Sequence, residues 1–242
     1  MHPDIYSPDV ERRYQAAIAV EGTLLSEQMP FGCCGSGNAF LALIGPSMGG
    51  PAPGATLQPG GDNRPEGSPM RIGHHHHFNW QKARSDRWRR LSAALLGGER
   101  YVNYLTAVLN LDWGHQSNAK DVQERFLQPG FDNYVWPAIM QIRPRIVCAL
   151  TNPVWQTIEP TIRKLAVASP PSLPTSILVS RQPIIFQLPN ENFTSILLKA
   201  HNHPSQPFLS RKHIQMLGDA CHWFSTAWPS HVGAGRTSHP AL

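Results

Sequence analysis

Short runs of consecutive apolar residues punctuate this chain, and the segments between them place apolar residues at helical spacing. The clearest runs are Ala39–Ile44 and Tyr101–Leu111, followed later by Arg145–Leu150 and Ser195–Lys199. A continuous apolar run bounded by turn residues is typical of a strand that is buried on both faces of a sheet. The pattern therefore predicts four core strands.

The intervening segments predict helices. Strands that alternate with helices favour a parallel sheet covered on both faces. We therefore expect an α/β fold with a central four-stranded, mostly parallel sheet flanked by helices. The predicted helices span 9–28, 82–96, 122–140 (broken near Pro129-Gly130), 154–166 and 210–223, with short strands near 177–179 and 184–186.

The length of 242 residues favours a single domain with a substantial core. Within it we expect an N-terminal helical segment over 9–37, a long loop over 45–78 and a tail over 228–242. Fourteen of the twenty-nine residues from Gly45 to Gly73 are Gly or Pro, which excludes a helix or strand of any length there. Long loops inside a compact domain are often functional.

Net charge, cysteine content and targeting segments indicate which class of protein this chain belongs to. The formal net charge is +5, which suits a polyanionic partner such as nucleic acid. The four cysteines form no C-x-x-C pair, which is typical of reduced intracellular thiols. Neither a signal peptide nor a membrane-spanning run is recognisable. We expect a soluble cytoplasmic monomer without a cofactor.

The carboxyl ends of the four predicted strands are polar or contain glycine. In parallel sheets ligands bind beyond these ends. The ends therefore predict one pocket rim, made by Gly45-Pro46-Ser47, Asn110-Leu111-Asp112, Thr151-Asn152 and His201-Asn202-His203.

Three of these ends also carry familiar motifs. Leu43–Gly49 forms a strand and turn, Ala107–Leu111 ends a strand near an asparagine, and His203-Pro204-Ser205 precedes Leu209-Ser210. In this order the set resembles the uracil-DNA glycosylase superfamily over roughly residues 38–224. The resemblance implies a DNA glycosylase that flips a base out of DNA and hydrolyses its N-glycosidic bond.

The resemblance also implies roles for individual residues. His203 would donate a hydrogen bond to the departing base and stabilise it as an anion. Asn110 would read the edge of a pyrimidine, because its amide offers both a donor and an acceptor. Phe78 would form an aromatic floor, with Trp80 as the second candidate. The remaining base-binding residues would be Gly45, Pro46, Met48 and His77.

The chain departs from the family where water is positioned. The family has Asp or Asn followed by Pro at a point where this chain has Ser47 and Met48. Either Ser47 or Asp112, the nearest acidic residue by strand position, is then left to position the water.

DNA contacts are expected around the last loop and two helices. Phe208 and Leu209 would fill the gap left by the flipped base, the alternative being that both are ordinary core anchors. The basic helix over 82–96 would face phosphates, the alternative being a solvated surface. The predicted phosphate contacts are Ser205, Ser210, Arg211, Lys212 and Arg87.

His74–His77 is an unusual run of four histidines. It lacks acidic or thiol partners at ligand spacing, so we expect no metal site. The alternatives are an exposed polar loop or the wall of an enlarged base pocket. The second alternative favours a bulky modified base over uracil.

These patterns predict a monofunctional DNA glycosylase that removes a non-standard pyrimidine and leaves an abasic site. The expected substrate is hydroxymethylated or glucosylated cytosine, as in phage DNA, with a role in anti-phage defence. One alternative is uracil removal in base-excision repair, and another is a DNA- or modified-base-binding protein without turnover. A further rival is a metal-dependent nuclease that uses His74–His77 with His201 and His203, which the scarcity of clustered carboxylates disfavours.

Overall fold

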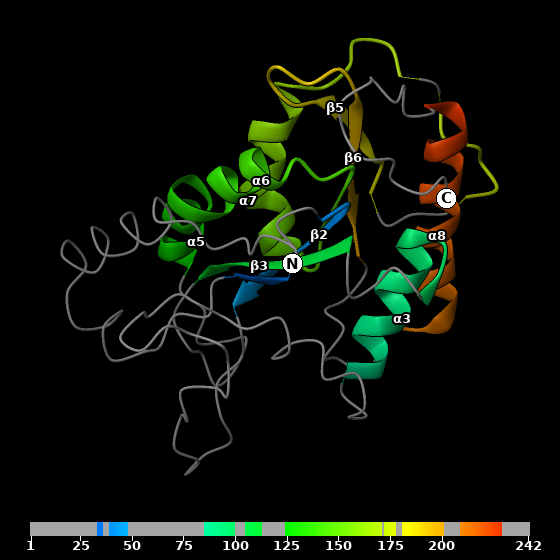
Figure 1. The fold of residues 1–242 in the computed structure, drawn as a ribbon, viewed down its shortest axis with the longest axis horizontal. Helices are drawn as coiled ribbons and strands as arrows, with labels where there is room; N and C mark the ends of the chain where they lie inside the picture. The colour runs from blue at the N-terminus through cyan, green and yellow to red at the C-terminus, as the bar shows by residue number, and fades with distance from the viewer. Residues whose placement is uncertain are drawn as a thin grey trace.

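A computed structural model gives a single α/β domain, and it describes residues 33–35, 39–47, 85–99, 105–112, 124–170, 172–177, 181–200 and 209–228. The described strands form one six-stranded sheet in the order β1-β3-β2-β4-β6-β5 (Figure 1). The strands are β1 (Cys33–Gly35), β2 (Leu41–Ser47), β3 (Thr106–Asp112), β4 (Ile146–Ala149), β5 (Ile184–Gln187) and β6 (Thr194–Lys199).

The four central strands β3, β2, β4 and β6 are parallel, as the apolar runs predict. The prediction that the sheet has four strands is wrong, because β1 and β5 add one antiparallel strand at each edge. β1 lies in the segment 9–37, for which a helix was expected. Three residues carry too little alternation to reveal such a strand, which is defined only by its pairing with β3.

Helices cover both faces of the sheet (Figure 1). One face packs against α3 and α8, and the other against α5, η2, α6 and α7. The chain thus builds three layers. The helices are α3 (Ser85–Leu96), α5 (Glu124–Gly130), the π-helix η2 (Phe131–Val135), α6 (Trp136–Ile142), α7 (Asn152–Arg163) and α8 (Arg211–Ala227).

Strand alternation divides the core into two halves. In β2, Leu41 and Leu43 belong to the cluster under α3 and α8, whereas Ala42 and Ile44 belong to the cluster under the other helices. All four side chains are completely buried. Burial on both faces explains why this strand reads as a continuous apolar run in the sequence.

The helical segment after β3 is not broken at Pro129-Gly130, contrary to the sequence prediction. Helix α5 contains Pro129, and the chain continues without interruption through the π-helix into α6. Proline removes an amide donor and crowds the preceding turn, and a wider π-turn is one way in which a helix accommodates such a disturbance.

Other predictions fall partly or wholly outside the described residues. The helix over 9–28, the tail beyond Trp228 and most of the loop over 45–78 lie there. That loop begins later than expected, because β2 continues to Ser47. Of the short strand expected near 177–179, only Ile177 is described, and it lies outside any strand.

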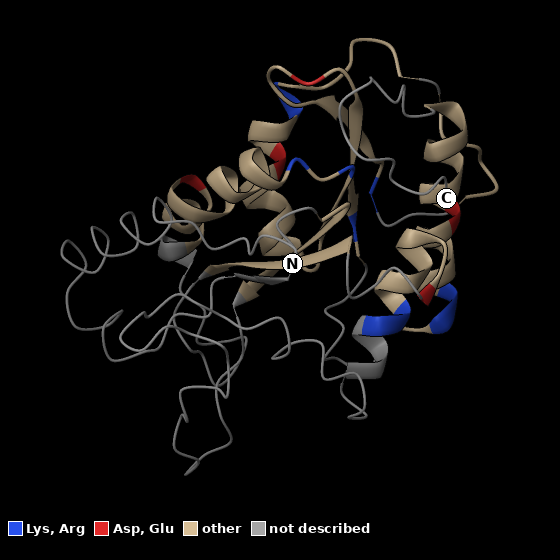
Figure 2. Cartoon of the chain, viewed as in Figure 1, with Lys and Arg blue, Asp and Glu red and all other residues tan. Residues whose placement is uncertain are grey.

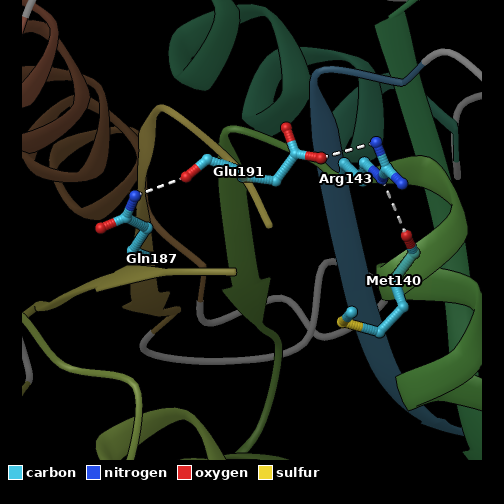
Figure 3. Close-up of polar contacts among 4 residues, drawn as sticks. All are labelled: Met140, Arg143, Gln187 and Glu191. Atoms are coloured by element: carbon cyan, nitrogen blue, oxygen red, sulfur yellow. Dashed lines mark hydrogen bonds and ion pairs between the residues drawn. The ribbon is translucent and has the colours of Figure 1, made fainter. Parts of the chain in front are cut away.

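A polar cluster fastens the end of α6 to the β5–β6 hairpin (Figure 3). Arg143 follows α6 in the left-handed region, with φ 54°. Its guanidinium lies 2.6 Å from a carboxylate oxygen of Glu191, and its Nε donates to the carbonyl of Met140 at 3.3 Å. Gln187 donates to the backbone carbonyl of Glu191. Arg143 therefore tolerates an unfavourable backbone conformation while linking two elements.

This conformation predicts an unusual order of stabilities at position 143. Arg143→Ala loses the ion pair and keeps the left-handed strain, whereas Arg143→Gly loses the ion pair but relieves that strain. We expect the Ala variant to be less stable than the Gly variant by about 1 kcal/mol. Urea unfolding of both variants measures the difference, and an Ala variant as stable as the Gly variant would contradict it.

Candidate functional site

The order of the strands defines where a ligand has room to bind. From β2 the chain crosses to β3 on one side of the sheet, and from β3 it returns past β2 to β4 on the other side. The two crossovers use opposite faces, with α3 on one and α5 to α6 on the other. Such a reversal opens a crevice beyond the carboxyl ends of the central strands.

The parallel register brings two of the predicted motifs together at this edge. Gly45 pairs with Asn110, and Ser47 pairs with Asp112. The backbones of both water-positioning candidates are therefore neighbours, although their side chains lie outside the described residues. Two of the three strand ends that carry the resemblance therefore lie next to each other.

Asn110 is a buried polar residue at the carboxyl edge of the sheet. It is only 2% exposed, and strand alternation places it on the α3–α8 face together with Val108. Its pairing partner Gly45 is buried and adds no side chain beside it. A buried amide with two donors and an acceptor can bind a planar polar group such as the edge of a base.

Backbone hydrogen bonds hold the adjacent strand ends level with this position. The amide of Leu150 donates to Ile44 at 2.9 Å, and the amide of Ala200 donates to Ala149 at 2.8 Å. Thr151 then caps α7, with its hydroxyl accepting from the amide of Val154 at 3.4 Å. The described ends of β3, β2, β4 and β6 therefore lie next to one another at one edge of the sheet.

A positive corner lies at the end of β6, and sequence reasoning missed it. Partial burial lowers the pKa of Lys199, and the nearby cation Arg181 lowers it further. Both effects disfavour the charged form of Lys199. An anion that binds here would offset the repulsion between Lys199 and Arg181. The signal available in the sequence was a lysine at the last position of a buried strand.

Leu209 is the predicted site residue whose surroundings decide between two alternatives. It is 4% exposed and belongs to the core cluster under α3 and α8. Its burial favours a core anchor over a wedge that enters the base stack. An apolar residue next to a helix start fits both roles in sequence, and only packing separates them.

Ser210 is the N-cap of α8, as its sequence position predicts. Its hydroxyl accepts from the amide of His213 at 3.3 Å and lies 3.1 Å from the Nδ1 atom of the same residue. Arg211 and Lys212 follow in the first turn, and both are exposed. Three of the five expected phosphate contacts, Ser210, Arg211 and Lys212, are thus exposed.

Several predicted site residues lie outside the part of the chain that the structure describes. The side chain of Arg87 is outside the described part, although its backbone lies in α3. The following predicted site residues lie outside the described ranges: His203, Phe78, Trp80, Met48, Ser205, Phe208 and the run His74–His77, which includes His77.

Gly130 is a second feature that sequence reasoning did not assign to the site. A Cβ built at this position would lie 1.7 Å from the carbonyl oxygen of Leu111. The backbone at the end of α5 therefore lies directly against the backbone of Leu111, between Asn110 and Asp112 at the end of β3. No space remains there for a side chain. The glycine beside Pro129 was visible in the sequence, but it was interpreted as a helix break.

Within the described ranges no group of His, Cys, Asp and Glu side chains has the arrangement of a metal site. None of the helices described there has the length and apolar character needed to cross a bilayer. No protein-family model matches the chain, and no curated protein matches it either.

Proposed function

We propose that this chain is a DNA glycosylase similar to the uracil-DNA glycosylase superfamily. The observation that carries the proposal is the pairing of Gly45 with Asn110 at the carboxyl edge, next to the point where the strand order reverses. Two segments that resemble that superfamily thereby meet where a parallel sheet binds its ligands. The order of the remaining motifs along the chain supports the same function.

In the proposed reaction a pyrimidine is flipped from DNA into the crevice. Asn110 binds the polar edge of the base. The bond between C1′ of the sugar and the base nitrogen breaks, the bonding electron pair leaves with the base, and His203 stabilises the developing anion. The oxygen of a water molecule then bonds to C1′, which leaves an abasic site, and the proton that this water loses passes to the released base. Ser47 and Asp112 are the two candidates that position this water.

The proposed substrate is a modified cytosine with a hydroxymethyl or glucosyl group. Its support is the sequence of the loop after β2, where histidines could contact additional hydroxyl groups. Uracil is the alternative substrate. Mass spectrometry of the bases released from DNAs that contain uracil, cytosine, hydroxymethylcytosine or glucosylated cytosine distinguishes them, and release of uracil alone would contradict the modified-cytosine proposal.

His203→Ala is expected to reduce the single-turnover rate of base release by about 10²-fold or more, the usual effect of losing one group that stabilises developing negative charge. His222→Ala is the matched control, because His222 is exposed on α8 and is not one of the residues that this helix buries. Equal rates for both variants would contradict the assignment of His203.

A second candidate function is binding of DNA or of a flipped base without turnover. The observation that favours it is Ser47, which stands where the superfamily has Asp or Asn. A wild-type protein that binds modified DNA but forms no abasic product at single turnover would support this alternative.

A further inference from the structure

Charged residues are rare in the strands of the sheet. Among the six described strands, the only basic residue is Lys199 and the only acidic residue is Asp112. Each is the last residue of a parallel strand, so both lie at the carboxyl edge, where a parallel sheet binds its ligands. Lysine is rarely kept in a core strand for packing alone, because burial of its charge is costly. The position of Lys199 therefore points to a function at this edge.

The other described basic residues lie in helices or loops. Figure 2 shows several of them near the starts of α3 and α8. Lys164 and Lys212 are the two other lysines in the described part of the chain, and both are exposed, one at the end of α7 and one in the first turn of α8. Lys199 is only partly exposed, and it pairs with Ala149 of β4. Its amine is thus the one that the described sheet itself brings to the carboxyl edge.

The β5–β6 hairpin brings a second cation close to Lys199. Ile184 pairs with Leu197 in antiparallel register, so the residues that precede β5 run alongside the end of β6. Partial burial lowers the pKa of Lys199, and the charge of Arg181 lowers it further. A larger share of Lys199 is therefore a neutral amine at neutral pH. The neutral amine is the form that attacks a carbonyl carbon, and lysines next to another cation are activated in this way.

The proposed hydrolysis supplies a carbonyl carbon at this edge. Cleavage of the N-glycosidic bond leaves an abasic sugar, and the open-chain form of this sugar has an aldehyde at C1′. In that reaction His203 acts on the bond between the base and C1′. His203 follows Lys199 by four residues, which span at most about 14 Å of extended chain. The amine of Lys199 therefore comes from the end of the same strand as the group that acts on this bond.

We propose that Lys199 is the nucleophile of a second activity, which cuts the DNA strand at the abasic site. This activity goes beyond the proposed hydrolysis and rests on it for its substrate. The lone pair of the amine adds to C1′ of the aldehyde, and loss of one water molecule gives an imine. A proton then passes from C2′ to solvent, a double bond forms between C2′ and C3′, and the 3′ phosphate leaves with the electron pair of the C3′–O bond. Water hydrolyses the imine, which releases Lys199 and an unsaturated aldehyde without any oxidant or reductant.

A duplex that contains one preformed abasic site tests the proposal without any need for base release. The wild type is expected to cut the strand on the 3′ side of this site. With sodium cyanoborohydride present, which reduces the imine to a stable amine, the protein is expected to become covalently joined to the DNA. Denaturing electrophoresis detects the joined species, and peptide mass spectrometry of the wild-type adduct is expected to place the linkage at Lys199.

Two variants separate the amine from the positive charge. Lys199→Arg keeps the charge but cannot form the imine, because a guanidinium stays protonated. It is expected to lose both the adduct and the strand cut. Lys164→Arg is the matched control, because Lys164 is exposed at the end of α7 that lies away from the carboxyl edge, and it is expected to behave as the wild type. Thermal melting shows whether both variants are folded.

Either of two results would overturn the proposal. The first is a wild type that neither cuts the preformed abasic site nor forms an adduct with it, and the second is an adduct that maps to another amine or persists in Lys199→Arg. The proposed function fails separately. A protein that releases no base from modified DNA but is trapped through Lys199 on abasic DNA would refute the hydrolysis and support the strand-cutting activity. A protein that releases base but is never trapped would do the reverse.

Discussion

Arg145→Ala is expected to lower the free energy of unfolding by about 3 kcal/mol, since two backbone carbonyls would lose a charged donor in a nearly closed site. Arg145 is 5% exposed, and its two terminal nitrogens donate to the carbonyls of Thr194 and Trp228. Its guanidinium carbon lies 4.7 Å from the centre of the Phe224 ring. One side chain thus joins the starts of β4 and β6 to the end of α8.

The charge persists despite burial. Desolvation lowers the pKa of Arg145 below its ordinary value, to about 10, so the guanidinium is still protonated at neutral pH. Because no carboxylate among the described residues pairs with it, the carbonyls and the aromatic ring offset the desolvation. Urea unfolding at pH 7 measures the loss.

Two further variants separate geometry from charge. Arg145→Lys keeps the charge but not the planar fork that reaches both carbonyls, so it should be intermediate in stability. Arg163→Ala is the control, because its ion pair with Glu159 is exposed and should contribute less than about 0.5 kcal/mol. An Arg145→Ala variant no less stable than Arg163→Ala would show that the buried contacts are not stabilising.

The parallel part of the sheet was predictable from the sequence, because doubly buried strands leave continuous apolar runs. β2 and β6 are examples, and both appear within a few residues of the expected limits. The edge strand β5 also lies where a short strand is predicted, near 184–186, but the edge strand β1 is different. Cys33–Gly35 has three residues, and a strand of that length exists only through its hydrogen bonds to β3. Such long-range pairing leaves no local signal.

The site was predictable to the extent that it follows from topology. Carboxyl ends of neighbouring parallel strands must meet, so the proximity of Gly45 and Asn110 could be expected from strand assignment alone. The environment of Leu209 could not, because its burial depends on how α8 packs against the sheet. The approach of Gly130 to Leu111 also depends on packing between distant segments.

The described charges suggest why α8 needs strong anchoring at its far end. Its first turn carries Arg211 and Lys212 against the helix dipole. Its last turn is fixed by the bond from Arg145 to Trp228 and by the burial of Phe224. The contacts at the amino edge of the sheet thus offset the unfavourable charges at the carboxyl edge.

Gly130→Ala is expected to lower the free energy of unfolding by about 3 kcal/mol, at the upper end of the usual cost of overpacking. An alanine in a helix is normally more stable than glycine by about 1 kcal/mol, so the expected sign is reversed. The reason is that the added Cβ would lie 1.7 Å from the carbonyl oxygen of Leu111. Since backbone atoms on both sides are held by a helix and a strand, the end of β3 has to move.

This movement has a consequence for the proposed reaction. Leu111 lies between Asn110 and Asp112, so the shift would displace Asn110, the proposed base-binding residue, from its pairing partner Gly45. We expect base release to slow by about 10²-fold even well below the melting temperature, as misplacement by about 1 Å can do. Gly218→Ala is the control, because its Cβ would lie 3.0 Å from the carbonyl oxygen of Ala94 and needs only a small adjustment. A Gly130→Ala variant as stable and as active as Gly218→Ala would show that the close approach does not position the end of β3.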